Sequence, residues 1–351
     1  MKGENERAAD AGANEEPKFV IADQAIDKIL LVRPSFRMGN SILATPFVFR
    51  FRNQFPSARI DFVGGPISAM LFENLPIDHH YQITRRFPEA SWAYLSLIKQ
   101  IRSTKYDLAV ELSGSQSAMG AWITGWSGAR HRIGLEGKRG RYYDLALPKP
   151  ATRNKYEIAA ALARSMQLGG TQNLPKLVLT TNEKEEGLRR LESLIGNGKA
   201  ADAGVFLGAR ARKGKRWPLE SFLEVIKELR ASHVNVVAFA GPEEKELIDY
   251  VHWALNGKVP IVYEKSVRRF AAMVSACRVF VTCDSGPMHL ACALRVRTVA
   301  IFQKNNVEHW APPPSLAKVV LSDVSPKGVT RTTLLEVWRA EMTEASRGVQ
   351  Q

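Results

Sequence analysis

The stretch VFVTCDSGPMH at residues 279–289 joins a short apolar segment to a turn and then to the start of a helix. Residues 279–283 suit a buried strand, Gly286 permits a tight turn, and Pro287 fits the first helical position, where its missing N–H group costs nothing. A helix that begins here directs free backbone N–H groups and a partial positive charge beyond the end of the strand. Three polar residues lie within about one turn of that start: Asp284, Ser285 and His289. The stretch therefore predicts a diphosphate-binding site.

Short apolar runs alternate with helical patterns along the rest of the chain. Strands are predicted at 28–33, 59–64, 107–112, 204–207, 234–240, 259–262, 279–283 and 297–302. Helices are predicted at 41–53, 91–103, 183–194, 267–276 and 287–294, with an amphipathic helix after 207 and another from about Glu243. This alternation is typical of α/β proteins in which helices wrap parallel sheets.

The chain divides into a tail and two domains. Residues 1–24 are rich in Ala, Glu, Asn and Gly, which predicts a disordered tail. The polar stretch 180–203, with its Gly196-Asn197-Gly198 break, marks a domain boundary. We therefore predict domains at 25–180 and 181–351, each long enough for a core of its own.

The net charge of +14 favours partners that carry phosphate groups. Six basic residues and four glycines fall between Gly128 and Arg141, which predicts a mobile surface loop. The loop is either a solvated surface or a contact for an anionic ligand. Because Tyr142 and Tyr143 are its only aromatic residues and no recognition motif accompanies them, we expect no nucleic-acid partner.

The apolar segments and the cysteines restrict the cellular location of the protein and the state of its thiols. No apolar run approaches the roughly 20 residues that cross a bilayer, and the first residues lack the apolar core of a signal peptide, so we expect a cytoplasmic protein. The three cysteines lack the C-x-x-C spacing of zinc or redox sites, so we expect buried, reduced thiols.

Five motifs resemble those of glycosyltransferase family 9, the heptosyltransferases that build the lipopolysaccharide core. The D-S-G-x-x-H motif at 284–289 resembles the family's signature. Four others occur in the family's order: the strand, glycine loop and helix at 28–46, the second strand at 55–63, the G-A and K-x-W-P elements at 208–218, and the turn at 239–244. The resemblance implies the GT-B architecture, in which two Rossmann-like domains face a cleft.

The resemblance also implies a donor site in the second domain. Gly208, Lys215, Ser285 and Gly286 match residues that contact the diphosphate, and His289 belongs to the same motif. Asp284 matches an acid that binds the donor sugar. Glu243 matches an acid on the ribose hydroxyls, with Glu244 as the alternative register. No metal is implied, because the sequence has no D-x-D motif and a cationic loop can offset the same charge.

The expected general base is where the chain departs from the family. The usual G-D pair of the first loop reads Gly39-Asn40 here, and an amide cannot accept a proton at neutral pH. Asn40 can still orient an acceptor hydroxyl. Three carboxylates are alternatives for the base: Glu111, Asp78 and Asp107. Glu111 is favoured, because it follows an apolar strand and precedes small residues.

Three functions are compatible with these motifs. The leading hypothesis is an inverting, metal-independent glycosyltransferase without a cofactor. Its donor would be a nucleotide-diphosphate sugar, which the resemblance implies is ADP-heptose, and its acceptor a lipopolysaccharide-core or related glycolipid. Asn40, Glu111 and Lys215 would be its catalytic residues, and Gly39, Asn40, Arg130, Arg132 and Arg139 would bind the acceptor during transient contact with the inner membrane. The alternatives are a catalytically degenerate nucleotide-sugar-binding protein and a nucleotide-sugar epimerase.

Overall fold

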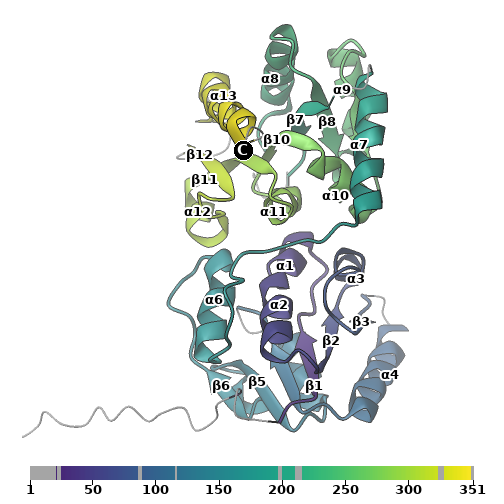
Figure 1. Cartoon of the computed structure of the whole chain (residues 1–351), viewed down its shortest axis with the longest axis vertical. Coiled ribbons are helices and arrows are strands. Elements are labelled where there is room, and N and C mark those ends of the chain that lie inside the picture. Colours follow the sequence, from purple (N-terminus) through teal and green to yellow (C-terminus); the bar gives the residue numbers. More distant parts are fainter. Residues whose placement is uncertain are drawn as a thin grey trace, which may run out of the picture.

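The computed structural model describes residue 21 and residues 25–85, 89–114, 117–196, 200–209, 216–322 and 328–348. These residues form two halves, each built on a six-stranded parallel sheet (Figure 1). The strand orders are β3-β2-β1-β4-β5-β6 and β12-β11-β10-β7-β8-β9. Lys215 and every residue of the predicted tail except Ile21 lie outside the described ranges.

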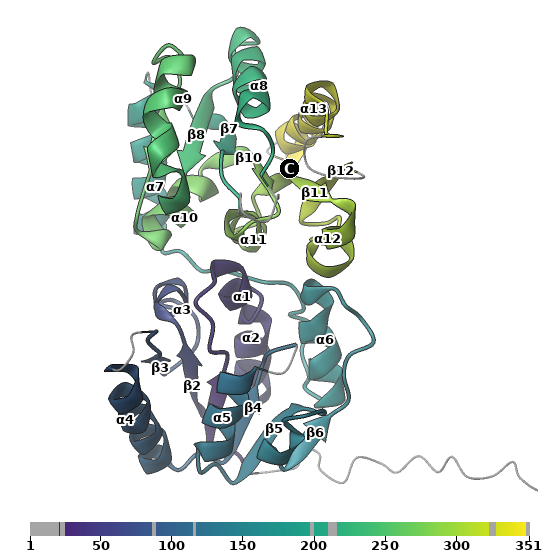
Figure 2. The ribbon, with the colours of Figure 1, turned by 180° about the vertical axis from the view of Figure 1, so that it is seen from behind.

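The first half carries helices on both faces of its sheet. Its strands are β1 Lys28–Val32, β2 Arg59–Gly64, β3 His79–Gln82, β4 Leu108–Glu111, β5 His131–Leu135 and β6 Leu145–Leu147. Its helices are α1 Met38–Ile42, α2 Thr45–Gln54, α3 Pro66–Leu71, α4 Glu89–Thr104, α5 Ala118–Trp126 and α6 Lys155–Ser165. Alternate residues of β1 face opposite layers: Ile29 and Leu31 share a core with α2 and α6, whereas Leu30 and Val32 share one with α4 and α5 (Figures 1 and 2).

The second half repeats this plan. Its strands are β7 Ala201–Phe206, β8 Val236–Ala240, β9 Ile261–Tyr263, β10 Cys277–Cys283, β11 Arg297–Gln303 and β12 Ala317–Ser322. Its helices are α7 Thr181–Ile195, α8 Leu219–Ala231, α9 Ile248–Ala254, α10 Val267–Ser275, α11 Gly286–Ala293, α12 Lys304–Trp310 and α13 Arg331–Gly348, with a 3₁₀ helix η4 at Pro242–Leu247. Helices α7 and α10 cover one face of the sheet, and α8 and α13 cover the other.

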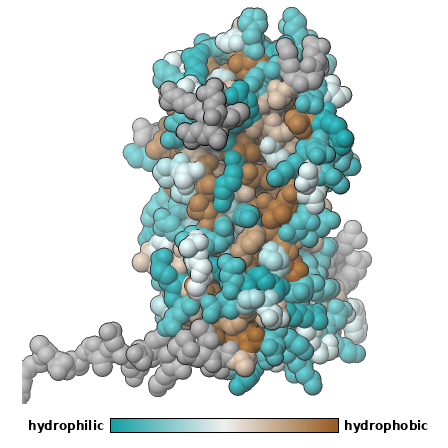
Figure 3. Space-filling view, viewed as in Figure 1, coloured by the Kyte–Doolittle hydropathy of each residue, from teal (hydrophilic) through white to brown (hydrophobic). Residues whose placement is uncertain are grey.

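The carboxyl ends of the two sheets face each other. The chain crosses between the halves on the way from α6 to α7 (Figure 1). At the junction α1 contacts α11, α3 contacts α10, and α6 contacts α12. On the side seen in Figure 3, apolar residues show in a central strip between hydrophilic margins. Because the carboxyl ends of the strands face each other, the loops that follow the strands of both halves come together at the junction. Ligands bind at such loops in open α/β sheets.

The predicted strands agree with the structure to within a few residues, and β2 coincides with the prediction. The predicted helix at 41–53 was wrong as a single element, because it divides into α1 and α2. Pro46 has no N–H group for the carbonyl of Ile42, which instead accepts the Thr45 hydroxyl at 2.8 Å.

The predicted mobile loop at 128–141 was also wrong. Its residues form β5 and a 3₁₀ turn, Gly140–Tyr142. Strand β5 pairs on both sides, with β4 and with β6, so the ladder overrides the glycine-rich local sequence.

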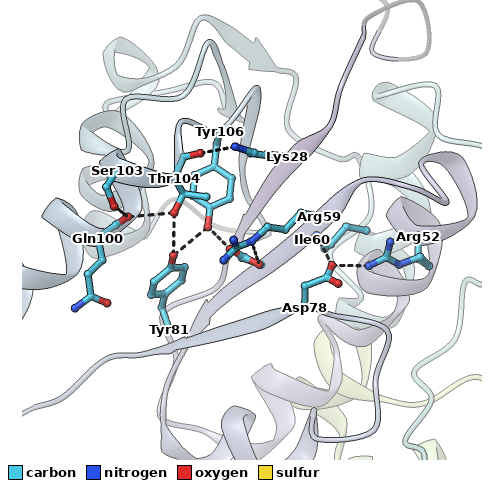
Figure 4. A network of polar contacts seen from close by, with 11 residues as sticks. Lys28, Arg52, Arg59, Ile60, Asp78, Tyr81, Gln100, Ser103, Thr104 and Tyr106 are labelled. Carbon is cyan, nitrogen blue, oxygen red and sulfur yellow. Dashed lines mark hydrogen bonds and ion pairs between the residues drawn. The ribbon is translucent and has the colours of Figure 1, made fainter.

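A polar network fastens the amino-terminal edge of the first sheet (Figure 4). The buried Asp61 carboxylate accepts hydrogen bonds from Tyr106 and from Arg59. The Tyr106 hydroxyl lies 3.2 Å from that of Tyr81 and accepts its proton, because its own single proton goes to Asp61. These contacts satisfy a buried charge on the side of the sheet away from the junction.

The three cysteines are buried and unpaired, as predicted, and burial raises the pKa of each thiol. No helix among the described residues is long and apolar enough to cross a membrane.

Candidate active site

The loop between β10 and α11 presents a helix N-terminus at the junction. Ser285 is extended and its side chain does not cap the helix. Its hydroxyl instead lies 3.1 Å from the hydroxyl of Thr282. The N–H of Asp284 donates to the carbonyl of Ile301 at 3.1 Å, which ties the loop to β11. The first N–H groups of α11 are therefore not occupied by a capping side chain, as an anion site requires.

His289 links the two halves. Its Nδ1 shares a hydrogen bond of 2.6 Å with the hydroxyl of Tyr156 on α6, and both side chains are buried. Its ring also lies near the ring of Trp310, with centroids 6.1 Å apart. The sequence motif suggested that His289 contacts the nucleotide-sugar donor. In the structure its side chain instead connects the two halves.

Two glycines allow α1 and α11 to approach closely. A Cβ at Gly39 would lie 2.6 Å from Cδ2 of His289. A Cβ at Gly286 would lie 3.2 Å from Cβ of Met38. The predicted donor loop and the predicted acceptor loop therefore lie against each other.

Asn40 lies on α1, beside this contact. Its side-chain amide donates to the hydroxyl of Ser35 at 3.1 Å, and the same hydroxyl accepts the N–H of Arg37 at 3.2 Å. Asn40 is half-buried, and its amide helps to shape the loop between β1 and α1.

Two of the three candidate bases lie at the amino-terminal ends of the strands of the first sheet, and the third lies at the carboxyl end. Asp78 accepts from the N–H of Ile60 and pairs with Arg52, each at 2.7 Å (Figure 4). Asp107 accepts the N–H groups of residues 27 and 28, each at 2.9 Å. Both carboxylates are engaged at the amino-terminal edge. Glu111 is the last residue of β4, at the carboxyl edge that faces the second half.

Glu111 is a buried and incompletely bonded carboxylate. It is 2% exposed, its Oε1 accepts the N–H of Ser113 at 3.0 Å, and its Oε2 has no hydrogen-bond partner among the described residues. Gly120 of α5 packs against it, since a Cβ there would lie 2.6 Å from Oε1. Burial raises the pKa of Glu111 to about 7, although Ser113, Arg33 and Arg139 oppose this shift. A carboxylate in this state can exchange a proton near neutral pH.

Arg33, which the sequence motifs did not single out, lies near this carboxylate, and Lys155 lies near Arg33. Arg33 directly follows β1, and Lys155 begins α6. Burial lowers the pKa of both, the charge of Arg33 adds to the effect on Lys155, and Glu111 opposes the shift of Arg33. Neither cation forms an ion pair with a carboxylate within the part of the chain that the structure describes. Lys155 and Tyr156 carry no sequence signal, because only the tertiary fold brings α6 to the junction.

The described end of the K-x-W-P element lies next to the donor loop. Trp217 is fully buried; its N–H donates to Sγ of Cys283 at 3.4 Å and its Nε1 to the carbonyl of Val329 at 3.1 Å. Arg216 lies close enough to act electrostatically on Cys283 and on Glu244. Arg216 therefore lies near Cys283, the residue that precedes Asp284, and Lys215 precedes Arg216 in the sequence.

Gly208 lies against Glu244 rather than Glu243. A Cβ at Gly208 would lie 2.3 Å from the Glu244 carboxyl carbon, and Glu244 accepts the N–H of Gly241 at 3.0 Å. Burial raises the pKa of Glu244, whereas Glu243 is exposed in the same turn. Glu244 therefore shapes the turn, and Glu243 is the carboxylate open to solvent.

The three candidate arginines of the acceptor site are not equivalent. Arg132 is paired with Asp144 at 2.6 Å, and Arg130 is exposed. Arg139 is half-buried and near enough to Glu111 to lower the pKa of that carboxyl. The structure thus brings Arg139 to the candidate base, while Arg130 and Arg132 lie on β5 or immediately before it. No group of three or more potential metal ligands comes together among the described residues.

Comparison with known proteins identifies the relatives of this chain. Residues 94–338 match the sequence model of glycosyltransferase family 9 (heptosyltransferase). The chain is 25% identical over 295 residues to lipooligosaccharide heptosyltransferase 2 of Campylobacter jejuni subsp. jejuni serotype O:2, covering 81% of this chain and 83% of the relative.

Two solved structures share its fold. The family 9 glycosyltransferase of Veillonella parvula DSM 2008 has a TM-score of 0.80 at 17% identity, covering 91% of this chain and 97% of that one. The E. coli ADP-heptose lps heptosyltransferase II has a TM-score of 0.76 at 22% identity, covering 91% and 99%. These likenesses confirm the predicted GT-B architecture of two Rossmann-like halves.

Replacing Gly39 by Ala should weaken the junction. The new methyl group would lie within 2.6 Å of the His289 ring unless α1 moves away from α11. Overpacking of this kind costs about 1–3 kcal/mol, so the melting temperature should fall by several degrees. Gly140→Ala is the matched control, because its nearest neighbour would be 3.9 Å away. Equal melting temperatures for Gly39→Ala and wild type would contradict the close approach.

Glu111 should make the protein less stable as pH rises. Its pKa is raised in the folded state, so the unfolded chain loses its proton first, and stability falls between about pH 4.5 and 7 before levelling off. Glu111→Gln removes this loss. The free energy of unfolding of the variant should exceed that of wild type by at most on the order of 3 kcal/mol at pH 8, and by much less at pH 4. Urea unfolding at both pH values measures the difference, with exposed Glu136→Gln as the control. A gain that is the same at both pH values would contradict the assigned shift.

Proposed function

This chain belongs to glycosyltransferase family 9 and is a transferase, and we propose that it moves heptose from ADP-heptose, with inversion, to a lipopolysaccharide-core or related anionic glycolipid. The observation that carries the proposal is that each half presents a group suited to the reaction at the end of a strand that faces the junction. One is the N-terminus of α11, which the Ser285 side chain does not cap, and the other is the buried Glu111 carboxylate, whose Oε2 has no hydrogen-bond partner among the described residues. The first suits a diphosphate and the second suits a hydroxyl that must lose a proton.

The donor would bind in the second half. Its diphosphate would lie on the start of α11, with contacts from Ser285 and Gly286, and Lys215 would offset the charge that builds up on the leaving group. Asp284 would contact the sugar, and Glu243 would contact the ribose. The name of the E. coli neighbour supports ADP-heptose as the donor.

The reaction would proceed by one displacement. The acceptor hydroxyl oxygen attacks the anomeric carbon, and its proton passes to Glu111. The bond between that carbon and the phosphate oxygen breaks, and ADP leaves with the electron pair. A base with a pKa of about 7 matches this task, because it is substantially ionised at neutral pH and still basic enough to accept the proton.

Asn40 would position the acceptor and leave proton transfer to Glu111. Its amide already donates to Ser35, and its carbonyl oxygen remains able to accept a hydrogen bond from a substrate hydroxyl. Arg139, together with Arg33 and Lys155, would attract the acceptor's anionic groups, and Arg130 and Arg132 would extend this positive surface. We place the reaction at the cytoplasmic face of the inner membrane, where such an acceptor is anchored.

The test of the function is ADP release from ADP-heptose with and without a core acceptor. Acceptor-dependent release, with a product heavier by one heptose, supports the proposal. Tight ADP-heptose binding without release would identify a degenerate binding protein. A changed free sugar nucleotide without transfer would identify an epimerase. A panel of ADP, UDP and GDP sugars in the same assay selects the donor.

Lys215→Ala should impair use of the donor. The loss of one charge-assisted contact to a diphosphate costs about 1.5–3 kcal/mol, which corresponds to roughly 10–100-fold in kcat/KM. The exposed Lys227 on α8 provides the control for removal of a lysine charge. Wild-type kinetics in Lys215→Ala would show that the phosphate site lies elsewhere.

Glu111→Gln should lower kcat by about 10²–10⁴, the scale of general-base loss, while the KM for the donor changes little. The kcat of the wild type should rise with pH through about 7, as Glu111 loses its proton, and this rise should be absent in the variant. Asn40→Ala should cost less than Glu111→Gln. If Glu111→Gln retains full activity while Asn40→Asp increases it, the base belongs at position 40 instead.

A further inference from the structure

Two helices of the first half expose an apolar surface on the face opposite α2 and α6. Trp92 and Leu95 of α4 are 78% and 58% exposed, and Trp126 of α5 is 53% exposed. Beside them is an open hollow of about 480 Å³, lined by Ser91, Tyr94, Leu95, Met119 and Trp122. Figure 2 shows α4 and α5 side by side over the first sheet. We name this surface, made of Trp92, Tyr94, Leu95, Met119, Trp122 and Trp126, the tryptophan face.

The aromatic rings of this surface are continuous. The rings of Tyr94 and Trp122 meet edge to face with centroids 6.2 Å apart. Trp122 lies 6.4 Å from Trp126 by the same measure. The rings therefore extend from the hollow to the exposed end of α5, and large exposed patches of this kind mark interaction sites.

Basic side chains border the tryptophan face. Lys99 and Arg102 are exposed. They lie seven and ten residues after Trp92 in the sequence, and this helical spacing places them on the same side of α4. Arg102 also reaches the end of α5, where its Cγ would lie 3.4 Å from a Cβ at Gly128. Arg132, whose charge is paired with that of Asp144, donates to the carbonyl of Gly125 at 3.2 Å, next to Trp126. The rings thus end among cations.

We propose that the tryptophan face docks on the surface of an anionic phospholipid bilayer. Trp and Tyr rings prefer the headgroup level of a membrane, where apolar and polar surroundings meet. Lys and Arg beside them bind lipid phosphates, and each contributes to attraction by an anionic surface. The connected rings and the cations lie on one face, so both contacts form in one orientation.

A second copy of the chain fits this face less well. A two-fold dimer would set the face against itself, and Lys99 and Arg102 would approach the same cations of the other copy. Such an arrangement would need counter-charges, whereas an anionic bilayer supplies them.

The position of α5 connects this surface to the candidate base. Gly120 packs against the Glu111 carboxylate, while Met119 and Trp122 of the same helix line the hollow. One helix therefore separates Glu111 from the docking surface. This part of the inference rests on the proposed function, because it takes Glu111 as the base. A glycolipid anchored in the bound bilayer would reach Glu111 past the side of α5.

Vesicle sedimentation tests the proposal with the full chain. Wild type should bind phosphatidylglycerol-containing vesicles more tightly than pure phosphatidylcholine vesicles. Binding to the anionic vesicles should weaken at about 0.5 M salt, because salt at this concentration screens exposed charge. The triple variant Trp92→Ser, Leu95→Ser, Trp126→Ser should bind at least about 10-fold more weakly. The matched control is Tyr250→Ser with Trp253→Ser, an exposed aromatic pair on α9 of the second half, which should bind as wild type does. Because all the substituted side chains are exposed, circular dichroism should be unchanged.

A charge variant separates the two contributions. Lys99→Ser with Arg102→Ser should remove most of the preference for anionic vesicles and leave the weak binding to phosphatidylcholine. Wild-type vesicle binding by the triple variant, or no binding by wild type, would overturn the proposal. A wild-type dimer in light scattering that the triple variant abolishes, without vesicle binding, would assign the face to a second copy instead. If the chain binds no vesicles but retains an acidic protein, the tryptophan face would be assigned to a protein partner.

Transfer to a water-soluble core saccharide keeps this proposal distinct from the proposed function. The triple variant should retain wild-type turnover with that acceptor and lose rate only with acceptor in vesicles. Normal soluble turnover without vesicle binding would refute the docking surface alone. Vesicle binding by a chain that transfers no sugar would refute the function alone.

Discussion

The close approach of α1 to α11 is the constraint on which the candidate site depends. It requires a position without a side chain at Gly39, and the buried hydrogen bond between Tyr156 and His289 holds α6 to the same helix. Together these contacts fix the distance between the loops that follow β1 and β10. Met38 lies over Gly286, because a Cβ at that glycine would be 3.2 Å from Cβ of Met38 and 3.4 Å from its sulfur.

Glu111 shows the opposing demands of folding and chemistry. A fully buried carboxylate with one unbonded oxygen costs stability in the neutral to alkaline range, and the fold tolerates it at the end of β4. The other acids of the first sheet are compensated: Asp61 by Tyr106 and Arg59, and Asp78 by Arg52. A destabilising group retained among compensated ones is typical of a site that needs its reactivity.

The sequence predicted the parts of the fold that local patterns encode. Eight of the twelve described strands and the turn before α11 follow from apolar runs and from Gly286-Pro287, whereas β3, β5, β6 and β12 were not predicted. Elements stabilised by neighbours were not predicted: β5 has a glycine-rich and basic sequence, and only its ladders with β4 and β6 make it a strand. The division of the predicted helix at 41–53 could have been read from Pro46, since proline removes the hydrogen bond that would have joined α1 to α2.

The same division between local and tertiary information holds for the site. Asp284, Ser285 and Glu111 were singled out because they lie at or just after the end of a predicted strand. Tyr156 and Lys155 were not, because α6 reaches the junction only through the path of the chain between the halves. A partner for His289 on another helix 133 positions away leaves no mark in the sequence near either residue.

Cations around Glu111 couple its basicity to the acceptor. Arg33 and Arg139 lower the pKa of Glu111 against the larger effect of burial, so they keep it ionisable near neutral pH. In the proposed reaction an acceptor anion that binds these cations would offset part of their charge. The pKa of Glu111 would then rise, because less positive charge would stabilise its ionised form. The base would be strongest when an acceptor is present to give up its proton, and binding and proton transfer would be linked through electrostatics alone.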